Sequence, residues 1–135
     1  MWIQMGKNGF SVLIVDDSII VSDRIIEGLK ELDCIRALIS ALNYEEAVRH
    51  LSDLEIDLAL IDINMPGKNG MDLLLYIKEH FPSVINIMLT NQSGTYYRNL
   101  CNKMGADFFL DKTTEFEKVP DLINMCFRKL NDHPA

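Results

Sequence analysis

The sequence predicts an α/β domain in which five strands alternate with five helices around a parallel sheet. Short runs of branched aliphatic residues, typical of buried strands, alternate along the chain with segments of helical periodicity. No linker, repeat or low-complexity segment interrupts this alternation. The chain has 135 residues, 48% of them hydrophobic, which suits one domain with a substantial core. Strands that alternate with helices in this way imply right-handed crossovers and helices on both faces of the sheet.

The first half of the chain contains two predicted strand and helix units and a third strand. The first strand covers residues 10–15, and Ser18 can cap a helix that extends to about residue 32. The second strand covers residues 35–40. Residues 43–46 then have the spacing of a capping box at the start of the second helix. The third strand is the aliphatic run that ends at Asp62.

The second half repeats the pattern. The third helix is expected over residues 70–80, because Pro82 disfavours helical geometry in the residue before it. A strand over residues 84–89 precedes the fourth helix, whose apolar stripe ends before Gly105. The fifth strand covers residues 107–110. A short turn at Val119-Pro120 and a last helix to about Leu130 complete the pattern.

Polar side chains stand where these strands end. They are Asp16, Asp17, Asp62, Thr90 and Lys112. Open parallel sheets bind their ligands outside the carboxyl ends of the strands, so these side chains are expected to lie together. Carboxylates beside a single ammonium favour a hard divalent cation with oxygen ligands.

Composition excludes other classes of function. A net charge of −7 argues against direct nucleic-acid binding, which relies on cationic side chains. No apolar run approaches the ~20 residues that span a bilayer, and the N-terminus lacks the features of a secretory signal, so a cytoplasmic protein without membrane contact is expected. The odd number of cysteines favours reduced, packed thiols: Cys34, Cys101 and Cys126.

The ordered set of strand-end residues resembles the receiver domain of two-component response regulators. The resemblance rests on the following residues: Asp16-Asp17, Asp62 with Met65-Pro66 and Gly70, Thr90, Gly105-Ala106-Asp107 and Lys112. It covers residues 10–130, which leaves residues 1–9 as an N-terminal extension and 131–135 as a tail. A receiver implies a flavodoxin-like fold with strand order 2-1-3-4-5.

The resemblance also implies a chemistry. Asp62 would be the phosphoacceptor, receiving a phosphoryl group from a sensor histidine kinase or a histidine phosphotransfer protein with the help of Mg²⁺. Asp17, Asp62 and the backbone carbonyl of Asn64 would bind the metal directly, and Asp16 would act through water. No separate general base is needed, because such transfer depends mainly on positioning and electrostatics.

Two further side chains complete the implied machinery. Lys112 would bind a phosphoryl oxygen, and the Thr90 hydroxyl would move toward the same group. Phe109, three residues before Lys112, resembles the switch aromatic of receivers. Together they would alter the face formed by helix 4, strand 5 and helix 5, where a downstream protein or a second copy docks. The chain would then be a regulator that assists its own phosphorylation and dephosphorylation.

Three positions depart from the receiver pattern. Thr113 follows Lys112 where many receivers carry a cis proline, so the isomer of this bond is open. Asn91 stands where a small residue is common, which predicts narrower access to the acceptor. The segment over residues 92–97 replaces an acidic, alanine-rich helix entry, and Tyr96 is expected to be exposed toward a partner.

Other interpretations remain open at this point. The chain could be a receiver excised from a larger response regulator or hybrid kinase. A flavodoxin-like cofactor binder would need a loop rich in Ser, Thr and Gly after the first strand, whereas residues 15–18 are anionic. A phosphohydrolase with an Asp62 nucleophile expects a second acid where Asn64 stands. A scaffolding receiver without phosphorylation is disfavoured by the intact site.

Overall fold

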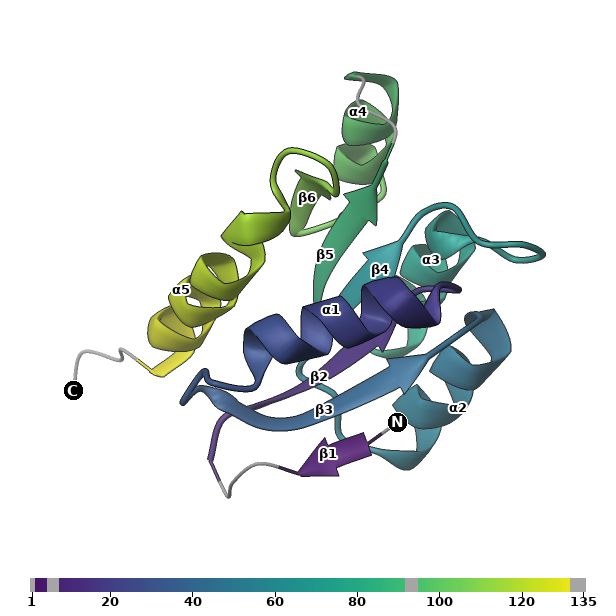
Figure 1. The fold of residues 1–135 in the computed structure, drawn as a ribbon. Coiled ribbons are helices and arrows are strands. Elements are labelled where there is room, and N and C mark those ends of the chain that lie inside the picture. Colours follow the sequence, from purple (N-terminus) through teal and green to yellow (C-terminus); the bar gives the residue numbers. More distant parts are fainter. Residues whose placement is uncertain (1, 5–7, 92–94, 132–135) are drawn as a thin grey trace.

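Five parallel strands form most of one sheet in the computed structural model, which describes residues 2–4, 8–91 and 95–131 (Figure 1). These strands are β2 (Phe10–Val15), β3 (Ile35–Ala41), β4 (Leu58–Asp62), β5 (Ile85–Thr90) and β6 (Phe108–Asp111). They lie in the order β3-β2-β4-β5-β6, which is 2-1-3-4-5 when the parallel strands are counted along the chain. The expected fold class and strand order are therefore confirmed.

A sixth strand, β1 (Trp2–Gln4), pairs antiparallel with β3 at the edge of the sheet. Residues 1–9 were expected to form an extension, and no strand was predicted there. Three residues are too few to show the alternation that identifies a strand, so the pairing becomes visible only in three dimensions. Residues 1 and 5–7 of this extension lie outside the described part of the chain.

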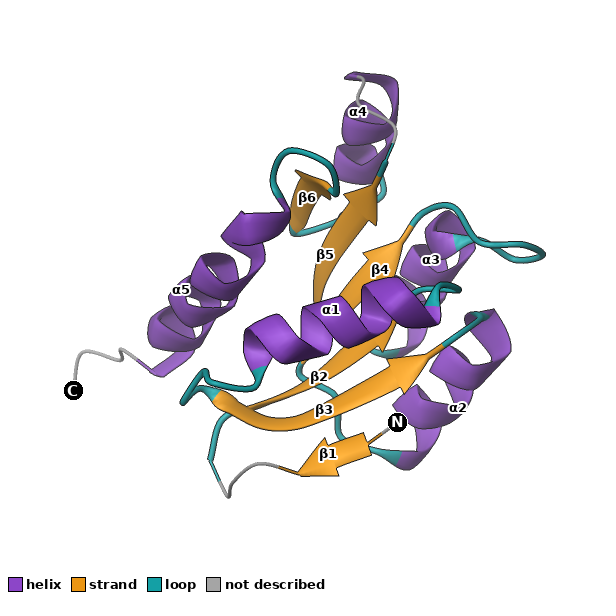
Figure 2. Cartoon of the chain, in the orientation of Figure 1, coloured by secondary structure: helices purple, strands orange, loops and turns teal. Residues whose placement is uncertain are grey.

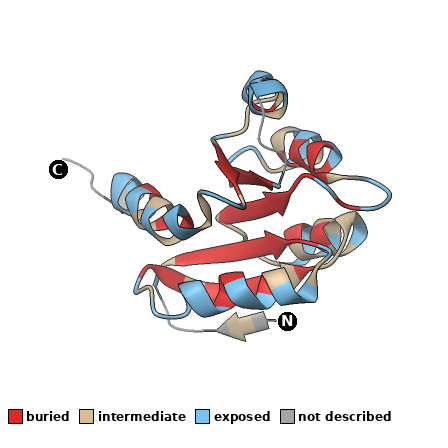
Figure 3. Cartoon of the chain, turned by 45° about the horizontal axis from the view of Figure 1, so that its top comes forward, coloured by how far each residue is buried: buried red, intermediate tan, exposed pale blue. Residues whose placement is uncertain are grey.

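Helices cover both faces of the sheet (Figure 2). α1 (Ile19–Leu29) and α5 (Val119–Asn131) pack on one face, and α5 follows a 3₁₀ turn, η1 (Phe116–Lys118). α2 (Tyr44–Asp53), α3 (Gly70–His80) and α4 (Thr95–Lys103) pack on the other face. The central strands are buried on both sides (Figure 3), which explains their continuous aliphatic runs.

Polar caps position the first two helices. The Ser18 hydroxyl accepts a hydrogen bond from the Val21 N–H at 3.3 Å, which confirms the expected cap of α1. At α2 the Asn43 side chain accepts from the Glu46 N–H at 2.8 Å. The Glu46 carboxylate accepts from the Leu42 N–H at 2.7 Å instead of that of Asn43, so the expected capping box is completed one residue earlier.

The cysteines and the membrane prediction can also be compared with the structure. All three cysteines are buried free thiols, as expected for packed core residues. Among the described residues, no helix has the length and apolar character needed to cross a membrane. The predicted element ends differ from the observed ones by a few residues. For example, α1 ends at Leu29 where about residue 32 was expected.

Candidate functional site

Two adjacent carboxylates follow β2 at the carboxyl edge of the sheet. The Asp16 N–H donates to the Ala41 carbonyl of β3 at 3.1 Å, so the backbone of Asp16 continues the sheet ladder. The Asp16 side chain turns inward, and the residue is only 1% exposed. Its Oδ1 accepts from the Ser18 N–H at 2.9 Å, while Asp17 is exposed to solvent. Among the described residues, hydrogen bonds are thus seen for the Asp16 carboxylate of the pair and not for that of Asp17.

Asp62 ends β4, between β2 and β5, and its residue is 5% exposed. The start of α3 packs directly against this strand end. A Cβ on Gly70 would lie 2.2 Å from the Asp62 carbonyl oxygen, so only glycine allows this approach. A complete capping box between Asn69 and Asp72 fixes the start of the same helix. Helix packing and capping therefore hold the loop after Asp62.

Lys112 brings its ammonium group between the two buried carboxylates. Its Nζ contacts Asp16 Oδ2 and lies 3.3 Å from Asp62 Oδ1. The lysine side chain is 7% exposed, and its backbone N–H donates to the Thr90 carbonyl at 2.8 Å. One cation thus faces the carboxylates that end β2 and β4, as predicted from the strand ends. With Asp17 nearby, the negative charges outnumber this positive charge.

Burial has a large effect on the acidity of Asp62. Loss of solvent raises the pKa of its carboxyl from an ordinary value of 3.8 to about 6. The neighbouring Asp16 carboxylate also raises this pKa, whereas the Lys112 ammonium and the Asn64 N–H lower it. The site therefore holds a carboxylate that is costly to ionise, and a second cation would relieve that cost.

The donor set fits a divalent metal ion. Ligand oxygens of Asp16, Asp17 and Asp62 lie within 4.8 Å of one another. Oxygens on opposite sides of an octahedral Mg²⁺ lie about 4 Å apart, so small side-chain rotations would bring two of these carboxylates onto one ion and leave the third within reach of a metal-bound water. Asn64, the fourth predicted ligand residue, is exposed beside them, and its N–H donates to Asp62 Oδ1 at 3.2 Å.

The expected switch residues lie on neighbouring strands. Thr90 is fully buried at the end of β5, and the Asn64 amide lies 3.5 Å from its hydroxyl oxygen. Phe109 lies on β6 beside Met88 of β5 and is 7% exposed. Its ring belongs to the apolar layer beneath α2, α3 and α4. In this structure the ring therefore faces inward.

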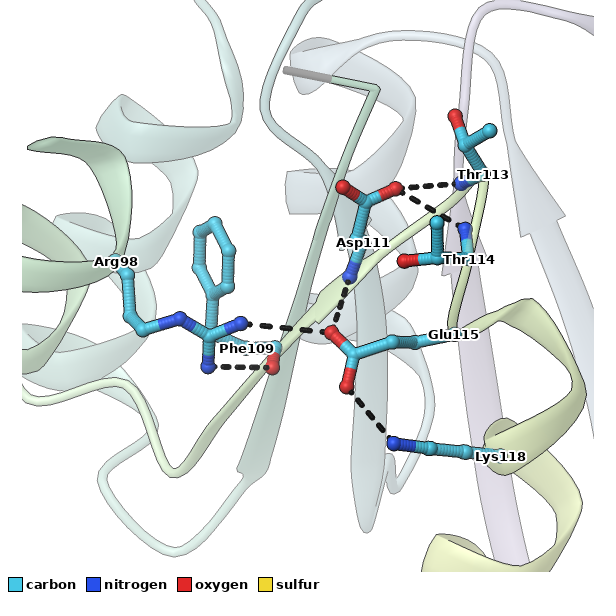
Figure 4. Close-up of polar contacts among 7 residues, drawn as sticks. All are labelled: Arg98, Phe109, Asp111, Thr113, Thr114, Glu115 and Lys118. Atoms are coloured by element: carbon cyan, nitrogen blue, oxygen red, sulfur yellow. Dashed lines mark hydrogen bonds and ion pairs between the residues drawn. The ribbon is translucent and has the colours of Figure 1, made fainter. Parts of the chain in front are cut away.

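A polar network that the sequence did not predict lies beside Phe109 (Figure 4). The Arg98 guanidinium of α4 lies 4.7 Å from the Phe109 ring centroid and 3.5 Å from the Phe109 carbonyl oxygen. It also lies 3.4 Å from Glu115 Oε1. Hydrogen bonds from the Asp111 N–H and from Lys118 hold the pKa of Glu115 below its ordinary value. No spacing rule pairs Arg98 with Glu115, because they belong to different elements.

The three departures from the receiver pattern have different outcomes. No peptide bond among the described residues is cis, so the Lys112–Thr113 bond is trans. Asn91 is exposed, and Tyr96 is an exposed aromatic residue as expected, with 69% of its surface accessible. Residues 92–94 of the atypical segment lie outside the described residues, and α4 begins at Thr95.

Comparison with known proteins identifies the family. Residues 12–124 match the family model of the response regulator receiver domain. Among solved structures, the receiver domain of the Francisella response regulator 1452 has a TM-score of 0.81 at 22% identity, covering 90% of this chain and 99% of that one. A CheY-like receiver domain protein from Methanospirillum hungatei has a TM-score of 0.82 at 22% identity, covering 93% and 98%.

The curated relatives are longer proteins, and their names describe different activities. Transcriptional regulatory protein MalR of Bacillus subtilis is 31% identical over 119 residues, which are 88% of this chain and 51% of that protein. A protein-glutamate methylesterase/protein-glutamine glutaminase of Idiomarina loihiensis is 34% identical over 112 residues, 82% of this chain and 29% of that protein. The matched part of the chain thus spans about half of the first relative and less than a third of the second. With a matching family model over most of its length, the chain belongs to the response regulator receiver domain family.

Proposed function

We propose that this domain accepts a phosphoryl group on Asp62 from the phosphohistidine of a sensor histidine kinase or a histidine phosphotransfer protein. The observation that carries the proposal is a buried carboxylate at a strand end, 3.3 Å from the Lys112 ammonium and beside two further carboxylates. An Asp62 oxygen forms a bond to phosphorus, the bond between phosphorus and the imidazole nitrogen breaks, and the imidazole leaves with the electron pair.

Each residue at the site has a task in this transfer. Asp62 must be ionised to attack, and a pKa of about 6 leaves it mostly ionised above neutral pH. The Lys112 ammonium neutralises charge on a phosphoryl oxygen, and the Thr90 hydroxyl donates a hydrogen bond to another. Positioning and charge stabilisation of this kind suffice for phosphoryl transfer, so no further base takes part.

The proposed cofactor is Mg²⁺, which reduces the repulsion between the carboxylates and the incoming phosphoryl group. Asp17, Asp62 and the backbone carbonyl of Asn64 would hold it directly, with Asp16 acting through water. The hydrogen bonds of Asp16 support an indirect role for this residue, because its two oxygens already contact the Ser18 N–H and the Lys112 ammonium. Asp17 is exposed and has its carboxylate turned to the same cluster.

The proposed output is a change in the face formed by α4, β6 and α5, where a downstream protein or a second copy of the chain docks in the cytoplasm. Thr90 and Phe109 would connect that face to Asp62. The chain would then be a regulator that assists its own phosphorylation and dephosphorylation. Residues 10–130 would form the signalling unit, whether it stands alone or belongs to a larger regulator or hybrid kinase.

The experiment is intact mass measurement after incubation with acetyl phosphate and Mg²⁺. The wild-type chain should gain the mass of one phosphoryl group, and chelation of the metal with EDTA should prevent the gain. Asp62→Asn is nearly isosteric and a poor nucleophile, so it should show no gain while remaining folded by circular dichroism. An unmodified wild type, or an equal gain in the variant, would contradict the proposal.

A further inference from the structure

Lys112 depends on a short loop for its position. Its ammonium reaches Asp16 and Asp62 from a backbone that leaves β6 at Asp111 and enters η1 at Phe116. A lysine side chain is flexible but limited in reach, so its ammonium can stay beside Asp16 and Asp62 only while the backbone of Lys112 is held close to them. The Lys112 N–H bond to the Thr90 carbonyl fixes one side of this backbone. Residues 113–115 must fix the other side.

The Asp111 carboxylate fixes the chain directly after Lys112. Its Oδ1 accepts from the Thr113 N–H at 2.7 Å and from the Thr114 N–H at 3.2 Å (Figure 4). The residue is only 7% exposed, and a buried carboxylate is stable only when hydrogen-bond donors surround it. Thr113 and Thr114 have no ring that restricts φ, so these hydrogen bonds determine the direction of the chain. They form the turn that an Asp side chain makes with backbone two residues ahead.

Glu115 closes the same loop. Its N–H donates to the Asp111 carbonyl at 2.8 Å, and its Oε1 accepts from the Asp111 N–H at 3.1 Å. In the described sheet β6 is an outer strand, and the Lys112 N–H already points toward β5. The Asp111 N–H therefore points away from the sheet, where Glu115 replaces a neighbouring strand. Asp111 Oδ1 accepts two hydrogen bonds from the loop backbone, and two further hydrogen bonds link Asp111 with Glu115, so both ends of the loop are joined.

We propose that Asp111, assisted by Glu115, is a positioning residue that places the Lys112 ammonium beside Asp62. The inference rests on the proposed function, in which that ammonium binds the transferred phosphoryl group. Neither acid touches the phosphoryl group or the metal in this account. The competing interpretation is that Asp111 stabilises the fold and has no influence on Lys112.

Matched variants separate the two interpretations. Asp111→Asn keeps an acceptor oxygen of the same shape, whereas Asp111→Ala removes it. The alanine variant should be phosphorylated by acetyl phosphate about tenfold to a hundredfold more slowly, the range expected for a misplacement of about 1 Å. The asparagine variant should keep most of the wild-type rate. Both variants should bind Mg²⁺ as tightly as the wild type does. In a Lys112→Ala background, Asp111→Ala should have no further effect.

A second measurement does not depend on phosphorylation. Acetic anhydride acylates accessible amines, and peptide mass analysis then gives the extent of reaction at Lys112 relative to Lys30, whose side chain is 43% exposed. Lys112 should be protected in wild type and in Asp111→Asn, and several-fold more reactive in Asp111→Ala. A wild type that accepts no phosphoryl group would refute the proposed function, while this labelling would still test the positioning.

Equal Lys112 reactivity in Asp111→Ala and wild type would overturn the inference, as would a rate loss that persists in the Lys112→Ala background. If Asp111→Ala does not fold, Glu115→Ala and Glu115→Gln provide the same comparison. Glu115 is partly exposed, and its glutamine variant keeps the acceptor for the Asp111 N–H. Glu115→Ala should increase Lys112 labelling, and Glu115→Gln should not. Equal labelling of both Glu115 variants and wild type would overturn the inference.

Discussion

Replacement of Asp62 by asparagine should stabilise the domain at alkaline pH when no divalent cation is present. Burial raises the pKa of Asp62 from 3.8 to about 6, so the folded state binds this proton more tightly than the unfolded chain does. The resulting stabilisation is complete below pH 3.8 and is lost as the pH rises through about 6. Above that pH the wild type carries an ionised carboxylate in an unfavourable place. Asparagine has the same shape and no charge.

The size of the effect follows from the shift in pKa. A rise from 3.8 to about 6 is about two pH units, and each unit corresponds to about 1.4 kcal/mol, which gives an upper limit of about 3 kcal/mol. Relaxation around the charge reduces this, so we expect a gain of about 1–3 kcal/mol at pH 8. For a domain of this size the melting temperature should rise by about 4–12 °C. At pH 5 the difference should be about half as large.

The assay is thermal and urea unfolding of both proteins in EDTA at pH 5 and pH 8. Asp17→Asn is the matched control, because it removes the same charge from an exposed residue and should give a smaller, less pH-dependent difference. Addition of Mg²⁺ should stabilise the wild type more than Asp62→Asn. An asparagine variant that is less stable than wild type at pH 8, or a difference independent of pH, would refute this account of the site.

Four further outcomes are expected. Millimolar Mg²⁺ should raise the melting temperature of the wild type, and Asp17→Ala should largely abolish this increase because it removes an accessible ligand. Lys112→Ala should still bind Mg²⁺, but beryllofluoride, a mimic of the phosphoryl group, should no longer shift the NMR signals of Phe109. In the wild type, beryllofluoride should change amide hydrogen exchange across residues 90–112, and changes confined to the ligands of Asp62 would contradict the relay. Arg98→Ala should speed exchange of the Phe109 amide without Mg²⁺, since it removes the side chain that covers the ring, and unchanged exchange would show that Arg98 does not hold it.

The parallel sheet and the central site residues were predictable because both leave local signals. A buried parallel strand is a run of aliphatic residues, and its carboxyl end is where a polar residue follows that run. Asp62 and Lys112 were found in this way, although they lie 50 positions apart in the chain. To predict that they lie close together, only the order of the strands was needed, and the resemblance to receivers supplied it.

Other features depend on contacts that no local pattern records. The strand at residues 2–4 is defined only by its pairing with β3. Arg98 and Glu115 meet because α4 packs beside the loop after β6. The role of Asp111 was not predicted, because the sequence does not show which backbone groups its carboxylate binds. The pKa of Asp62 likewise depends on how completely the folded chain excludes water from it.

Site mapping of the phosphoryl group tests the central claim most directly. Borohydride reduces an acyl phosphate to an alcohol, which converts a phosphorylated aspartate to homoserine and marks its position in a peptide digest. After reaction with acetyl phosphate and Mg²⁺, we expect homoserine at position 62 and none when the metal is chelated. Homoserine at Asp16 or Asp17 instead, or at no position, would contradict the assignment of Asp62 as the phosphoacceptor.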